Sequence, residues 1–215
     1  QLEGGGSASG GGGKKGKSKD GGGSGDARIQ LTGIEAFDAV FSEAQSIDER
    51  IARMTGELQA AQGAITQLSG GNGELNLEAI KASLPGTLMS SIQINLNIGQ
   101  GLPEITLAPQ APPDLVPWVD AIRQLATSAA QIAIDAPGMV KDVMALVDAA
   151  KAFPGEAPAS IQAAVASGAV KPLEAAKLPK KIVGNVEAMA QIPTDLAELG
   201  KEAMATMELV QALVQ

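Results

Sequence analysis

The feature of this chain that most restricts its fold is a long stripe of apolar residues spaced three or four apart. The stripe comprises Ile34, Phe37, Phe41, Ala44, Ile47, Ile51, Met54, Leu58, Ala61, Ile65 and Leu68. This spacing puts apolar side chains on one face of an α-helix. One step is missing between Ala44 and Ile47, and it resembles the stammer of a coiled coil. We therefore expect one long amphipathic helix over residues 33–68, which forms the spine of a helical bundle.

Local signals divide the rest of the chain into shorter helices. Thr32 and Glu35 fit a capping box, in which each side chain accepts a hydrogen bond from the other residue's backbone N–H. Proline and glycine commonly end helices. On this basis we expect helices over about 75–83, 114–135, 139–153, 159–166, 171–192 and 195–214, with breaks at Pro137, at Pro154 and near Pro179, and with Thr194 or Asp195 as the last cap.

The composition supports an all-α fold. Hydrophobic residues make up 45% of the chain but aromatic residues only 2%. Sheets favour β-branched and aromatic residues, so an alanine-rich chain with few rings is better suited to closely packed helices. Trp118, the single tryptophan, is expected to pack in the core beside a helix start.

One segment, residues 90–108, has the alternation of a half-buried strand. Ile92, Ile94, Leu96 and Ile98 alternate with polar residues, and a Gly-Gln-Gly turn follows at 99–101. We expect a small β-hairpin inserted near 90–108. Its apolar face either packs on the protein's own helices, which is the default, or forms an exposed tongue for a partner. Ile92, Ile94, Leu96 and Ile98 are the candidate partner-binding residues.

The first 27 residues are rich in glycine, serine and lysine and are expected to form a flexible tether to a helical domain over 28–215. This arm resembles the tethers that follow the lipidated cysteine of many bacterial surface lipoproteins. Whether such a cysteine or a signal peptide precedes Gln1 stays open. Residues 11–18 also match the Walker A string, but no strand or helix is expected around them, so we interpret the match as chance.

Charge and residue types exclude several functions. The net charge is −8, so duplex nucleic acid is not an expected partner. The arm, residues 1–26, has four lysines against three acidic residues, so it is locally basic on an acidic body. The chain has no histidine, cysteine or tyrosine, and its carboxylates are scattered. We therefore predict that the protein is not an enzyme, with no catalytic residues, no cofactor and no metal.

Three roles remain open for a chain of this kind. The first is a non-catalytic binding or scaffold protein, exported and tethered in the periplasm, at the outer membrane or at the cell surface of a bacterium, with a protein partner. The second is a membrane-active protein, since the outline resembles helical pore-forming toxins with a β-tongue. The third is a carrier of an apolar ligand. The oligomeric state is not predicted.

Overall fold

Three long helices form most of the molecule. The computed structural model describes residues 28–71, 75–95, 102–109 and 111–213 of the 215-residue chain. The long helices are α1 (Glu35–Leu68), α4 (Val116–Ala150) and α7 (Leu178–Leu213). The shorter elements are α2 (Leu77–Ser83), α3 (Leu88–Ser91), β1 (Ile92–Asn95), β2 (Glu104–Leu107), the 3-10 helix η1 (Pro113–Leu115), α5 (Phe153–Ala166) and α6 (Pro172–Ala175). The predicted all-α class is confirmed. The predicted tether over 1–27 lies outside the described residues.

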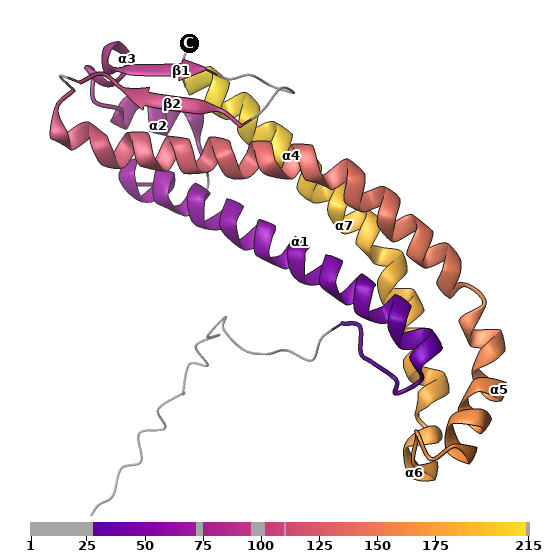
Figure 1. Ribbon diagram of the computed structural model, residues 1–215. Coiled ribbons are helices and arrows are strands. Elements are labelled where there is room, and N and C mark those ends of the chain that lie inside the picture. The colour runs from indigo at the N-terminus through magenta and orange to yellow at the C-terminus, as the bar shows by residue number, and fades with distance from the viewer. Residues whose placement is uncertain (1–27, 72–74, 96–101, 110, 214–215) are drawn as a thin grey trace, which may run out of the picture.

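The three long helices lie side by side as an elongated bundle (Figure 1). α1 and α7 run in the same direction, and α4 runs opposite to both. α4 packs extensively on α7 and on α1, whereas α1 and α7 contact each other less. Helices of 34 to 36 residues are about 50 Å long at 1.5 Å per residue. α2, α3, β1 and β2 gather at one end of this rod, and α5 and α6 form the other end (Figure 1).

The spine helix predicted over 33–68 is confirmed as α1. Its apolar stripe is buried at Phe37, Phe41, Ala44, Ile51, Met54, Leu58, Ala61 and Ile65, while Ile47, at the missing step, is only partly buried. Phe153 at the start of α5 packs against Phe37 and Phe41, with ring centroids 4.6 and 5.6 Å apart. Each buried side chain of this size contributes about 1.5–3 kcal/mol, so this face fixes α1 in the bundle.

The capping box predicted at Thr32 and Glu35 is wrong. The N-cap is Ile34, and Gly33 before it has a φ of +81°, a conformation that favours glycine. The carboxylate of Asp38 accepts hydrogen bonds from the Thr32 N–H at 2.6 Å, the Thr32 hydroxyl at 2.8 Å and the Gly33 N–H at 2.8 Å. The helix begins two residues later than the pattern indicates, so the carboxylate that reaches back is Asp38.

Two of the predicted helix breaks are also wrong. α4 continues through Pro137. α7 continues through Pro193, so the helices predicted over 171–192 and 195–214 are not separated there and neither Thr194 nor Asp195 is a cap. An interior proline removes a backbone hydrogen bond and costs about 3 kcal/mol. Apolar residues on both sides are buried, namely Ala136 and Met139 in α4 and Ile192 and Leu196 in α7. Packing of these stripes outweighs the local cost. The break predicted at Pro154 lies instead at residues 151–152, directly before α5, which begins at Phe153 and continues through Pro158. The predicted break near Pro179 is observed between α6 and α7.

The predicted hairpin region is described in part. β1 and β2 pair antiparallel, with Ile94 opposite Ile105, while residues 96–101 that connect them lie outside the described residues. Helix α2 begins after Asn76, whose side chain accepts from the Glu78 and Ala79 N–H groups at 3.0 and 3.1 Å. Trp118 is 6% exposed and lies in the core, as predicted.

The hydrogen bonds of Asp38 to Thr32 and Gly33 can be tested with a matched pair of carboxylates. Asp38→Ala should lower the free energy of unfolding by about 1–3 kcal/mol, since three hydrogen bonds lose their acceptor. Glu35→Ala, which removes the exposed residue of the expected capping box, should change it by less than about 0.5 kcal/mol. Urea unfolding followed by circular dichroism measures both. If Glu35→Ala lowers the free energy of unfolding more than Asp38→Ala does, the capping box of Thr32 and Glu35 is correct after all.

Candidate functional site

The hairpin residues proposed for partner binding are only partly placed by the structure. Ile92 and Ile94 belong to β1, and Leu96 and Ile98 lie outside the described residues. In the strand register, position 94 is opposite Ile105 of β2. Ile105 is 2% exposed, and its backbone oxygen accepts from the Arg123 Nε and Nη2 atoms at 3.0 and 2.9 Å. These bonds attach β2 to α4, and partner contact through Ile92, Ile94, Leu96 and Ile98 stays a prediction.

A larger candidate surface lies near the opposite end of the rod. A groove of about 790 Å³, open to solvent, runs between the segment 28–33 and the start of α7. Its lining contains more basic than acidic side chains and comprises Arg28, Gln30, Leu31, Thr32, Gly33, Glu174, Lys177, Leu178, Lys180, Lys181, Gly184 and Asn185. We call it the basic groove. It separates the point where the arm joins the body from the turn between α6 and α7.

One wall of the basic groove is held in place by a buried amide. Asn185 on α7 is 3% exposed. Its Oδ1 accepts from the Gln30 N–H at 3.0 Å, and its Nδ2 donates to the Gln30 carbonyl at 2.6 Å. Lys181 Nζ donates to the Leu31 carbonyl. Because the Gln30 backbone is satisfied by a side chain in this way, the segment 28–33 is attached to α7 without forming a strand.

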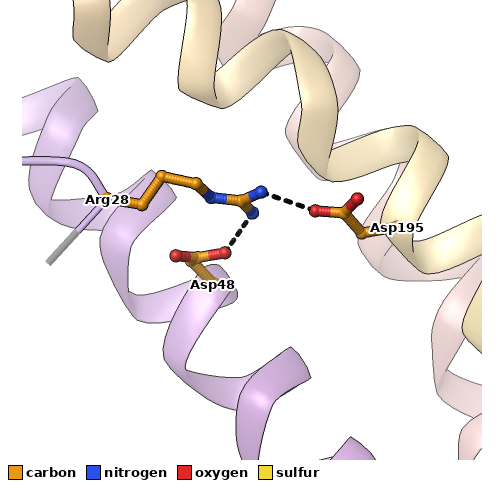
Figure 2. A network of polar contacts seen from close by, with 3 residues as sticks. All are labelled: Arg28, Asp48 and Asp195. Carbon is orange, nitrogen blue, oxygen red and sulfur yellow. Dashed lines mark hydrogen bonds and ion pairs between the residues drawn. The ribbon is translucent and has the colours of Figure 1, made fainter. Parts of the chain in front are cut away.

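Arg28 adds an ion-pair bridge at the end of this segment (Figure 2). Its guanidinium donates to Asp195 on α7 at 2.6 Å and also to Asp48 on α1. Burial of the guanidinium opposes its charge, but hydrogen bonds and the charges of Asp195 and Asp48 outweigh that cost and raise the pKa of Arg28 above its ordinary value. The bridge therefore joins the segment 28–33 to two of the three long helices.

The remaining cations of the groove are available to a ligand. Lys177 and Lys180 are exposed, and within the described part of the chain neither pairs with a carboxylate. Among the described residues that line the groove, Glu174 is the only acidic one. The arrangement suits anions such as phosphate groups, which lysine binds as a point charge.

A second depression of about 400 Å³ lies between α5 and α6. It is lined by Ile161, Gln162, Val165, Ala166, Pro172 and Ala175. Leu173 follows Pro172, which lines this depression, and precedes Glu174, which lines the basic groove. It is 85% exposed. The end of the rod near α6 therefore has apolar as well as basic surface.

Among the described residues, no group of three or more acidic side chains is placed to hold a metal ion. Within the same residues, no helix is long and apolar enough to cross a membrane.

No motif in the sequence marks the basic groove. The available signal was the lysine-rich stretch 171–181 in an otherwise acidic chain. No sequence signal marks Asn185, because its role depends on a residue 155 positions earlier.

The attachment of the segment 28–33 can be tested by comparing its two anchors. Asn185→Ala leaves the Gln30 N–H and carbonyl without their partner and should lower the free energy of unfolding by about 1–3 kcal/mol. It should also speed trypsin cleavage after Arg28. Arg28→Ala should cost less than about 1 kcal/mol, since its ion pairs are half-exposed. Gln124→Ala, at an exposed position of α4, is the control. Equal losses for Asn185→Ala and Arg28→Ala in urea unfolding would contradict this assignment.

The chain matches no protein-family model, no curated protein and no solved structure. The surfaces described above are therefore the basis for a functional proposal.

Proposed function

We propose that the protein is a non-catalytic helical binding or scaffold protein, tethered in the bacterial cell envelope by its N-terminal arm. The observation that supports this most is the attachment of the segment 28–33, which joins the arm to the bundle. A buried amide at Asn185 and the Arg28 bridge attach this segment to α7 and α1. A tethered domain needs such a junction, because the body must stay folded where the arm begins.

The shape of the body fits a scaffold. A rod about 50 Å long presents its sides to a partner over several helical turns. An arm of 27 residues reaches at most about 90 Å when fully extended. Tether and rod together would let the body contact a partner at some distance from its anchor.

The alternative roles predict different surfaces. A carrier of an apolar ligand needs a concave site that encloses most of the ligand, whereas the two depressions described above are open and the larger is lined by lysines. A membrane-active protein needs apolar faces that insert after rearrangement. If the protein causes dye to leak from vesicles, the membrane-active role is favoured over the scaffold role. If lipids from a test panel raise its melting temperature, the carrier role is favoured.

Fractionation of the source cells tests the tether. We expect the protein in the envelope fraction, with an acyl-modified cysteine directly before the peptide that starts at Gln1 in mass spectrometry. Replacing that cysteine with alanine should release the protein from the membrane, while a cysteine-containing control carrying Gln124→Ala should remain there. Co-purification of one partner protein from the envelope fraction supports the scaffold role. Recovery of unmodified protein in the cytosolic fraction would refute the proposal.

A further inference from the structure

The charge of the body is segregated along the rod. Residues 171–181 contain four lysines and one glutamate, a net charge of +3. The other residues of the body, 27–170 and 182–215, have a net charge of −12. Figure 1 places α6 and the start of α7 at one end of the bundle, so the positive charge is concentrated at that end.

The side chains at this end face solvent. Lys171, Lys177 and Lys180 are exposed, and Leu173 is 85% exposed, the highest value among the large apolar residues described. We call these four residues the α6 patch. A leucine among lysines is the combination found on surfaces that lie in a membrane interface, where lysine meets anionic headgroups and the apolar side chain enters the acyl boundary.

We infer that the α6 patch rests on an anionic phospholipid bilayer and that the rod stands with this end toward the membrane. This inference extends the proposed envelope tether. Each lysine near an anionic membrane contributes attraction equivalent to about a fivefold gain in affinity. The remainder of the body, at −12, is repelled by the same surface. Attraction at one end and repulsion along the rest orient the rod.

Vesicle sedimentation of the full chain tests this inference. The probes are vesicles of phosphatidylcholine alone and vesicles of phosphatidylcholine with phosphatidylglycerol. We expect binding to the anionic vesicles only, weakening as salt is raised because screening shortens the reach of the charges. The double variant Lys177→Gln with Lys180→Gln should lower the partition coefficient about thirtyfold. Leu173→Asn should lower it about tenfold through lost apolar contact.

The matched control is Lys141→Gln with Lys201→Gln, which makes the same change in net charge at exposed lysines outside the α6 patch. It should change the partition coefficient less than threefold. All variants keep the arm lysines, and circular dichroism checks that they fold. The inference is overturned if the wild-type chain ignores anionic vesicles, if both double variants lose binding equally, or if dextran sulfate, a soluble acidic polysaccharide, is bound in a Lys177-dependent way while the vesicles are not.

This assay needs no lipid anchor and is therefore independent of the fractionation experiment. If the protein carries an acylated cysteine but does not bind vesicles, the proposed orientation is wrong and the proposed tether stands. If the protein lacks an acylated cysteine but binds vesicles through the α6 patch, the proposed tether is wrong and the membrane contact stands.

Discussion

The bundle depends on the burial of α4 between its two neighbours. α4 packs on both α1 and α7, which contact each other much less. Its buried face is rich in small residues, including Ala126, Ala129 and Ala130. Opposite Ala136, a Cβ atom added at Gly200 of α7 would lie 3.9 Å away, within ordinary contact. Small side chains let helix axes approach closely, and this explains how a chain with so few aromatic residues still excludes water from a long core.

The continuity of α4 and α7 shows how tertiary packing overrides local signals. Pro137 and Pro193 each favour a break, and each lies inside a helix of 35 or 36 residues. A broken helix would change the direction of its apolar stripe and expose residues that now lie in the core. Each proline destabilises its helix at one position, whereas a break would reduce the burial of apolar side chains over several turns. The chain breaks instead at residues 151–152, where Phe153 turns α5 toward the phenylalanines of α1.

Two kinds of polar residue meet at the segment 28–33 and the start of α7. Asn185 and Arg28 attach the segment 28–33, and the lysines that follow α6 form the opposite wall of the basic groove. The Asn185 amide has hydrogen-bond partners within the protein, and the Arg28 guanidinium has carboxylate partners there. Lys177 and Lys180 lack a carboxylate partner in the described part of the chain, and this difference separates residues that hold the junction from residues available to a surface outside it.

The stripe over 34–68 was enough to derive α1 and the all-α class, because three-and-four spacing has only one regular solution and its burial requires partner helices. The residue types likewise indicated a core position for Trp118. Helix limits were beyond such reasoning, since α1 begins after Gly33 has taken a positive φ, and Asp38 rather than Glu35 accepts hydrogen bonds from Thr32 and Gly33. The basic groove could not be derived from the sequence either. Its two walls, which include Gln30 and Asn185, come together only after α1, α4 and α7 have packed. Periodicity determines what a segment buries, but contacts between distant segments are decided by the packed structure.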